Sequence, residues 1–184
     1  MVTIVADQSG ASIGQRVHEK MTDCGYHTEF FDLEGMRIEP CYGCGGCTYQ
    51  TFGKCIVRDD ADKVIPTMLR SKIYLFVSPV QFGGMSFSMK RMVDKFALVG
   101  DRYYYMNKGQ IVKGRKRDGK HLHVVGYSDE PTGESVQSFL GLVKETQELA
   151  VMPGLARVLP SQSGPDSIEK IVEEMVRYGG ISGD

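Results

Sequence analysis

The sequence has little net charge, no long apolar run and no internal repeat. A formal net charge of -1 gives no general attraction to nucleic acid or to an anionic membrane surface. The apolar run near the N-terminus is far too short for a signal peptide or a membrane span. The four histidines are scattered, and no nucleophile–histidine–acid arrangement stands out. We therefore expect a cytoplasmic protein with no nucleic-acid or membrane partner.

Length and composition indicate one globular domain spanning residues 1–184. A hydrophobic content of 41% and a charged content of 24% are typical of folded domains. A chain of 184 residues is long enough for one sizeable core and short for two. Two segments stand apart within this domain, a cysteine loop at 38–58 and a basic insertion at about 101–120.

Five apolar segments predict buried strands, and a predicted helix follows each of them. The strands are expected at 2–6, 26–33, 73–77, 121–127 and 155–159. Ser12 is expected to cap the first helix, with Gln15 completing a capping box. Parallel neighbours need crossover connections, so this alternation predicts an α/β fold with a parallel sheet and helices on both faces.

Four of the five cysteines fall in one short stretch, CYGCGGCTYQTFGKC. The spacing C-x2-C-x2-C-x7-C lets the thiolates turn toward one small centre, and glycines between them remove crowding Cβ atoms. Four soft thiolates suit an iron–sulfur cluster or zinc better than magnesium or calcium. We expect Cys41, Cys44, Cys47 and Cys55 to converge on one metal centre, with a 4Fe–4S cluster as the favoured occupant. Zinc, or a loop without metal, is the alternative; Cys24 is expected to be a buried, inert thiol.

Three loops are expected at the carboxyl ends of the strands, where ligands bind in such sheets. The loop at 7–12 has small residues before a helix, and free amides there suit a phosphate. In the loop SPVQFGG, Phe82 offers an apolar face, and Gly83 and Gly84 allow close backbone approach, which a flat ring system would use. Ordinary structural turns are the alternative for both loops. The third loop lies at 126–130.

The segment SPVQFGGMSFSMKRMVDKF resembles the flavin-contacting loop and following helix of the NAD(P)H-dependent flavin reductases, a flavodoxin-like family. The cysteine stretch followed by IVRDDAD is similar to the iron–sulfur flavoprotein branch of that family. The resemblance implies a flavodoxin-like three-layer sandwich whose five strands lie in the order 2-1-3-4-5. This sequence departs from the family pattern in a shorter first loop, and in Gln81 and Lys95, where tyrosine and arginine are usual.

Carried over by position, the resemblance implies an FMN site made of two groups of residues. The FMN phosphate would be contacted by Ser9, Gly10, Ala11, Ser12 and Ile13. The isoalloxazine would lie along Pro79, Val80, Gln81, Phe82 and Gly83, with Tyr127 or Ser128 closing its other side. No catalytic acid or base is expected, because the cofactor carries the chemistry.

The insertion at about 101–120 lacks clear periodicity and is rich in tyrosine and basic residues. Tyr103, Tyr104 and Tyr105 precede the basic residues Lys108, Lys113, Arg115, Lys116, Arg117 and Lys120. A basic flap could attract the phosphates of NADPH or an acidic partner protein. A solvated loop, or a dimer contact made by the tyrosines, is the alternative. We expect a homodimer with the three tyrosines near its interface.

These observations predict an FMN-dependent oxidoreductase. We expect electron transfer between NAD(P)H, or a ferredoxin-like donor, and a quinone, flavin or other small acceptor. A cluster on the cysteines would add one-electron exchange. FMN is expected rather than FAD, because one small domain offers no second nucleotide-binding half. The alternative is a flavodoxin-like binding or regulatory module with a degenerate flavin site and a zinc-bound or empty cysteine loop.

Overall fold

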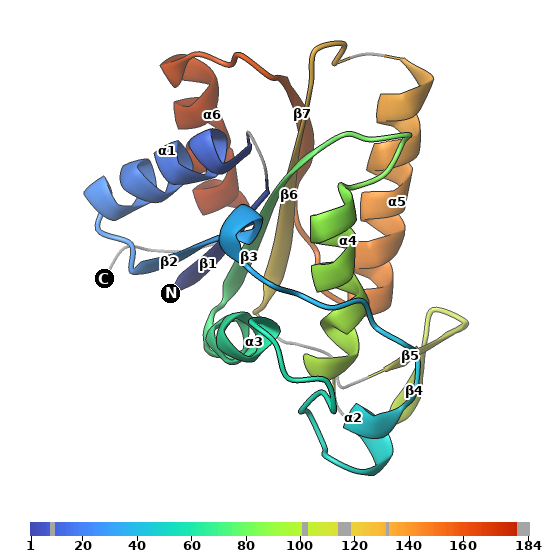
Figure 1. Cartoon of the computed structure of the whole chain (residues 1–184). Coiled ribbons are helices and arrows are strands. Elements are labelled where there is room, and N and C mark those ends of the chain that lie inside the picture. Colours follow the sequence, from blue (N-terminus) through green and yellow to red (C-terminus); the bar gives the residue numbers. More distant parts are fainter. Residues whose placement is uncertain (8–9, 101–102, 114–118, 132, 180–184) are drawn as a thin grey trace.

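A five-stranded parallel sheet forms the centre of the molecule (Figure 1). The structure is a computed structural model that describes residues 1–7, 10–100, 103–113, 119–131 and 133–179. The sheet contains, in spatial order, β2 (Thr28–Asp32), β1 (Val2–Ala6), β3 (Ile73–Pro79), β6 (His121–Ser128) and β7 (Ala156–Pro160). The three central strands are almost wholly buried, which explains their continuous apolar sequences. The expected α/β class with a parallel sheet is confirmed.

The strand order corrects the expected 2-1-3-4-5 to 2-1-3-6-7. The insertion contains two strands that the sequence analysis did not predict, β4 (Tyr104–Asn107) and β5 (Gln110–Lys113). They pair antiparallel with each other and form a separate two-stranded sheet. Lys108 and Gly109 join them with φ values of 49° and 81°, the backbone of a tight hairpin turn. The basic insertion is therefore an ordered β-hairpin in its described part.

Helices cover both faces of the sheet, as expected, and each buries an apolar stripe. One face carries α1 (Gly10–Asp23) and α6 (Pro165–Gly179). The other face carries α3 (Ala61–Arg70), α4 (Phe87–Asp94) and α5 (Glu134–Ala150). Shorter elements are α2 (Gly46–Tyr49) and the 3-10 helices η1 (Leu33–Gly35) and η2 (Lys95–Leu98). In the described part of the chain, no helix has both the length and the hydropathy that crossing a membrane requires.

Two local expectations around α1 are wrong. Ser12 does not cap this helix, because α1 already begins at Gly10 and Ser12 lies within its first turn. Gln15 donates a hydrogen bond to Glu19 (3.0 Å) on the next turn instead of closing a capping box. Cys24 is an exposed thiol rather than a buried one, because the helix ends at Asp23 and the chain turns away from the core there.

The two candidate sites lie at opposite ends of the molecule. The loops after β1, β3 and β6 meet at the carboxyl edge of the sheet, at the top of Figure 1. The cysteine loop runs to the lower end, where α2 lies beside the β4–β5 hairpin (Figure 1). Any ligand held by one site is therefore remote from the other within the same chain.

Candidate functional site

Asp7 makes hydrogen bonds to three segments at the carboxyl edge of the sheet. Its side chain is 1% exposed and accepts a hydrogen bond from the hydroxyl of Ser86. Its backbone N–H donates to Val77 O (3.1 Å), and its carbonyl accepts a hydrogen bond from the hydroxyl of Tyr127 (2.9 Å). Ser86 N in turn donates to Ser78 Oγ (2.9 Å). Asp7, the end of β3, the start of α4 and the end of β6 are thus held in one arrangement.

The sequence analysis did not identify Asp7 or Ser86 as parts of this site. Ser86 could have been found, because a serine directly before an apolar helical stripe is a typical N-cap. Its hydroxyl accepts from Met89 N (3.1 Å), as that role requires. The contact between Asp7 and Ser86 joins residues that are 79 positions apart, and no local pattern indicates it.

The loop after β3 presents a phenylalanine at the tip of a tight turn. Gln81 and Gly84 exchange two backbone hydrogen bonds of 2.9 and 2.8 Å. Phe82 and Gly83 between them have φ values of 50° and 74°, a backbone region that is unfavourable for a bulky residue. The Phe82 side chain is fully exposed. Gly83 N donates to Ser135 Oγ on α5 (3.0 Å), so an aromatic face is presented on a fixed turn.

Helix α1 begins at Gly10, four positions after the last residue of β1, and its first-turn amides therefore lie at the same edge. The first turn contains no acidic residue, so no carboxylate within that turn competes with an anion for its amides. The predicted phosphate contacts in this turn are Gly10, Ala11, Ser12 and Ile13. Ser9 lies outside the described residues. The side chain of Ile13 is buried in the core, so its backbone amide is what it can offer to an anion.

The remaining predicted flavin contacts are joined by a backbone hydrogen bond between two strand ends. Val80 N donates to Tyr127 O (2.9 Å), which places Pro79 and Val80 beside the end of β6. Tyr127 itself is buried, and its hydroxyl contacts the first loop, so it supports the site from within. Ser128 is half-buried and exchanges hydrogen bonds with the backbone of Glu130.

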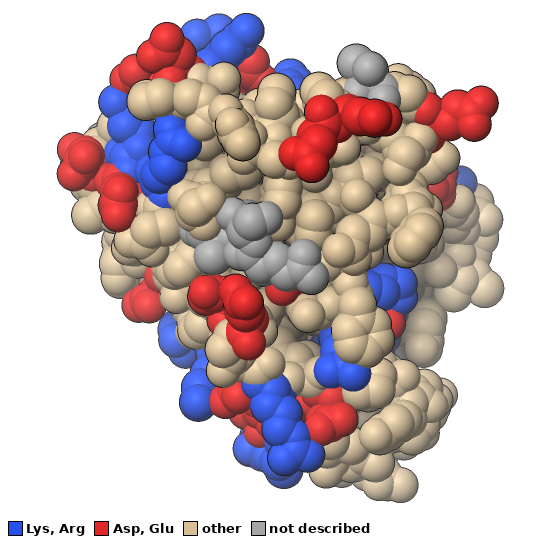
Figure 2. Space-filling view, turned by 45° about the horizontal axis from the view of Figure 1, so that its top comes forward, with Lys and Arg blue, Asp and Glu red and all other residues tan. Residues whose placement is uncertain are grey.

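The surface at this edge is not strongly charged. Figure 2 turns the edge toward the reader and shows large uncharged areas between separate groups of basic and acidic side chains. On the described part of this face, lysine and arginine do not form one continuous patch. A ligand with an extended uncharged ring system is therefore compatible with this face, whereas a polyanion lacks a broad basic surface on it.

Two of the three described lysines of the insertion donate hydrogen bonds within the fold, and the third, Lys108, is exposed at the hairpin turn. Lys113 donates to Thr48 Oγ1 and to Ala97 O (3.0 Å), which joins the hairpin to the cysteine loop. Lys120 donates hydrogen bonds to Leu69 O (2.9 Å) and to Ser71 O. Three further predicted basic residues lie outside the described residues, namely Arg115, Lys116 and Arg117. Two of the six basic residues thus have structural roles that compete with a role in binding NADPH.

All four predicted cysteine ligands line one small cavity of about 30 Å³. Cys41 and Cys44 are exposed, and Cys47 and Cys55 are half-buried. Within the residues that the structure describes, no three His, Cys, Asp or Glu side chains are grouped closely enough to hold a metal ion. The thiols therefore share a cavity without forming a finished ligand set, and the loop would have to tighten around a metal.

Comparison with known proteins shows which family has this combination of fold and loops. A model of the family described as NADPH-dependent FMN reductase matches residues 5–154. The chain belongs to this family. It is 33% identical over 97 residues to an iron–sulfur flavoprotein of Methanocaldococcus jannaschii, covering 52% of this chain and 49% of the relative. It is 31% identical over 106 residues to an iron–sulfur flavoprotein of Archaeoglobus fulgidus, covering 54% and 53%. The chain spans about half the length of the curated relatives that it matches.

Solved structures in the same comparison confirm the fold. An FMN-dependent NADH-azoreductase from Bacillus anthracis in complex with FMN superposes with a TM-score of 0.61 at 11% identity, covering 100% of both chains. A putative quinone reductase from Klebsiella pneumoniae gives a TM-score of 0.64 at 10% identity, covering 96% of this chain and 83% of that one. At such low identity the similarity concerns the fold alone.

The carboxyl edge of this FMN reductase family member fits the cofactor in the family's description. The first turn of α1 contains no acidic residue, and its backbone amides suit a phosphate group. The exposed side chain of Phe82 suits a flat ring. Gly83 packs directly against α5, because a Cβ atom there would lie 2.8 Å from Ser138 Cβ, so the Phe82 turn is held close to this helix. The cysteine loop fits a thiolate-bound metal by its donor chemistry and its shared cavity.

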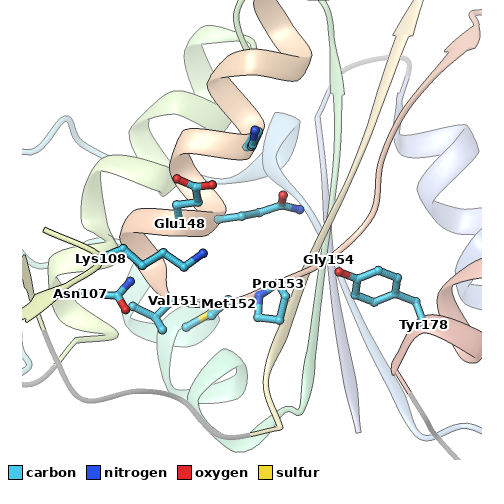
Figure 3. A pocket seen from close by; sticks show the side chains of 10 residues that line it. Asn107, Lys108, Glu148, Val151, Met152, Pro153, Gly154 and Tyr178 are labelled. Carbon is cyan, nitrogen blue, oxygen red and sulfur yellow. The ribbon is translucent and has the colours of Figure 1, made fainter. Parts of the chain in front are cut away.

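A further cavity, of about 560 Å³, lies apart from both sites (Figure 3). It is formed by the hairpin turn, the end of α5 and the segment that leads into β7. Lys108 extends into it from the hairpin and Glu148 from α5, and Tyr178 of α6 lies at its other side (Figure 3). None of its residues was predicted to contact the flavin. The cavity lies at the amino edge of β7, away from the flavin loops.

Proposed function

We propose that this protein is an FMN-dependent oxidoreductase that accepts electrons from NAD(P)H or from a ferredoxin-like donor. Its acceptor is a quinone, a flavin or another small molecule. One observation carries this proposal: Asp7, which follows β1, is hydrogen-bonded to the end of β3, to Ser86 at the start of α4 and to Tyr127 at the end of β6, so these segments share one edge of the sheet. Family membership supports the same cofactor.

The residues of the site bind and orient the cofactor rather than react with it. The first-turn amides of α1 would hold its phosphate, and the exposed ring of Phe82 would pack on its ring system and exclude water from that side. Gly83 supplies the positive φ that the Phe82 turn requires, and Ser135 fixes the turn by accepting from Gly83 N. When bound, FMN supplies hydride and single-electron chemistry.

Titration of the apoprotein with FMN, followed by flavin fluorescence, tests this proposal. Phe82→Ala removes the exposed ring, and we expect it to raise the dissociation constant about tenfold, the order expected for one lost aromatic contact. Phe52→Ala is the matched control, because Phe52 is also exposed with a positive φ (28°) but lies in the cysteine loop. A wild type that does not bind FMN, or that releases FAD on acid treatment, contradicts the proposal.

We further propose that Cys41, Cys44, Cys47 and Cys55 hold one 4Fe–4S cluster. Their soft donor set, their shared cavity and the iron–sulfur flavoproteins among the relatives support this assignment. Anaerobic purification followed by iron, sulfide and zinc analysis tests it. Iron and sulfide in equal amounts are expected; zinc alone, or no metal, contradicts the cluster and leaves the flavin proposal standing.

We also propose that the protein forms a homodimer through the β4–β5 hairpin. The hairpin and the residue before it expose large apolar side chains, namely Tyr103, Tyr104, Met106 and Ile111, whereas Tyr105, the third predicted tyrosine, is half-buried. Aromatic residues and methionine are enriched at protein–protein interfaces. Light scattering should give twice the monomer mass for the wild type and a lower mass for Ile111→Lys. A wild type that is monomeric at micromolar concentration contradicts this interface.

A further inference from the structure

Two consecutive aspartates, Asp59 and Asp60, join the two ends of the cysteine loop by hydrogen bonds. Asp59 Oδ2 accepts a hydrogen bond from Glu39 N (2.8 Å), and Asp60 Oδ2 accepts one from Arg37 N (2.9 Å). Asp60 N donates back to Arg37 O (3.0 Å). The chain therefore enters and leaves the cysteine loop at one point, and the four cysteines lie on the segment between these contacts.

A buried lysine completes this closure. Lys95 Nζ donates to Asp59 Oδ2, and the two side chains are only 2% and 1% exposed. Asp59 Oδ1 also accepts from Ala61 N (3.0 Å) at the start of α3. The Asp59 carboxylate thus joins the loop entrance, the first turn of α3 and η2. A buried ion pair adds little net stability compared with well-packed apolar residues, but its directional hydrogen bonds can define one geometry.

Lys95 lines the cavity that all four cysteines line. Arg91 of α4 makes a further contact with the base of the loop, because its Nη1 donates a hydrogen bond to Ile38 O (3.1 Å). At the far side, Lys113 donates to Thr48 in the short helix α2. The base of the loop is therefore held by the buried Asp59–Lys95 pair and the half-buried Arg91, while its first two cysteines remain exposed.

We propose that Asp59, Asp60 and Lys95 are positioning residues that hold the base of the cysteine loop so that its thiols can close on one metal centre. This inference rests on the metal part of the proposed function. A loop with separated ends must lose conformational freedom when a metal gathers its ligands, and this loss weakens binding. A loop whose ends are already joined in the folded apoprotein loses less, and therefore binds the metal more tightly.

Cobalt(II) titration of the reduced apoprotein under anaerobic conditions tests this inference. Thiolate–cobalt charge-transfer absorption reports the metal affinity without any enzymatic assay. In Asp59→Asn/Lys95→Met both charges are removed together, so no unpaired charge remains buried. We expect this variant to bind cobalt at least about tenfold more weakly than the wild type, because the Asp59–Lys95 contact is lost and the loop base is held only by Asp60 and Arg91.

Three measurements make the outcome decisive. Asp60→Asn, which changes a carboxylate with an exposed lysine partner, should weaken cobalt binding less than the double variant and remains informative if the double variant does not fold. Glu169→Gln is the control, because it breaks the exposed ion pair with Lys20 on the opposite face and should leave cobalt affinity unchanged. FMN affinity should be unchanged in all three variants, which confirms that they are folded.

Wild-type cobalt affinity in a folded double variant overturns the positioning role and leaves the proposed function intact. An Asp60→Asn variant that binds cobalt as tightly as the wild type overturns the part assigned to Asp60. Absence of thiolate–cobalt absorption in the wild type overturns the metal part of the proposed function, and the inference with it.

Discussion

Replacing Ser86 with alanine removes two hydrogen bonds made by one buried hydroxyl. Ser86 Oγ accepts from Met89 N (3.1 Å) as the N-cap of α4, and it donates to the buried carboxylate of Asp7. Alanine can make neither bond. The variant therefore weakens the start of α4 and the connection between the loops after β1 and β3.

The cost in free energy of unfolding can be worked out from these two contacts. Loss of a serine N-cap costs about 1 kcal/mol. Loss of a donor to a buried carboxylate costs about 1–3 kcal/mol. We therefore expect Ser86→Ala to destabilise the protein by about 2–4 kcal/mol, a large share of the roughly 5–15 kcal/mol that stabilises a typical domain. Ser135→Ala, which removes one exposed acceptor, should cost less than about 1 kcal/mol.

Urea unfolding followed by circular dichroism measures this difference. Asp7→Asn, introduced into the wild type and into Ser86→Ala, completes a double-mutant cycle. The two losses of unfolding free energy should be non-additive, because both substitutions remove the same hydrogen bond. Additive effects, or a cost of Ser86→Ala no larger than that of Ser135→Ala, would refute the conclusion that this bond holds the loops together.

Two further predictions concern a buried histidine and a crowded glycine. Burial, with a smaller contribution from the nearby His121, lowers the pKa of His123 to about 4. In the unfolded chain His123 binds a proton as the pH falls below about 6.5, whereas in the folded protein it stays neutral until about pH 4. The free energy of unfolding therefore decreases as the pH falls from 6.5 toward 4, by about 2 kcal/mol between roughly pH 7.5 and 5. Urea unfolding over this range should show the slope, and His123→Phe should flatten it; an unchanged slope contradicts the assignment. In Gly154→Ala the new Cβ would lie 1.8 Å from Leu122 O, so we expect a loss of about 3 kcal/mol or more in thermal or urea unfolding. Gly141→Ala, whose Cβ meets nothing within 4 Å, is the control and should stabilise α5 slightly; equal stabilities of the two variants would contradict the clash.

The parallel sheet and its helices could be predicted from the sequence because their signals are local. The run Ile73 to Val77 is apolar at every position, as a strand buried on both faces requires, and it became β3. The stripe of Met89 and Met92 identified α4 by its helical spacing. The grouping of four cysteines around one cavity was also predictable, because close spacing along the chain restricts how far apart they can lie.

Contacts between distant segments could not be predicted in the same way. Asp59 and Lys95 are 36 positions apart, and neither shows in its local sequence that it will be buried against the other. The β4–β5 hairpin escaped prediction because its strands have only four residues and expose several apolar side chains, so they lack a clear alternation.

Sequence by itself determined the fold class, the three loops at the carboxyl edge and the cysteine stretch, because each depends on residues that are neighbours along the chain. Only the tertiary structure decided that Asp7 joins those loops, that Asp59 and Lys95 close the cysteine loop, and that the two sites lie at opposite ends. The physical reason is that periodicity and spacing determine which face of an element is buried. Which distant charged or polar groups meet there depends on how the elements pack, and burial then makes their hydrogen bonds necessary.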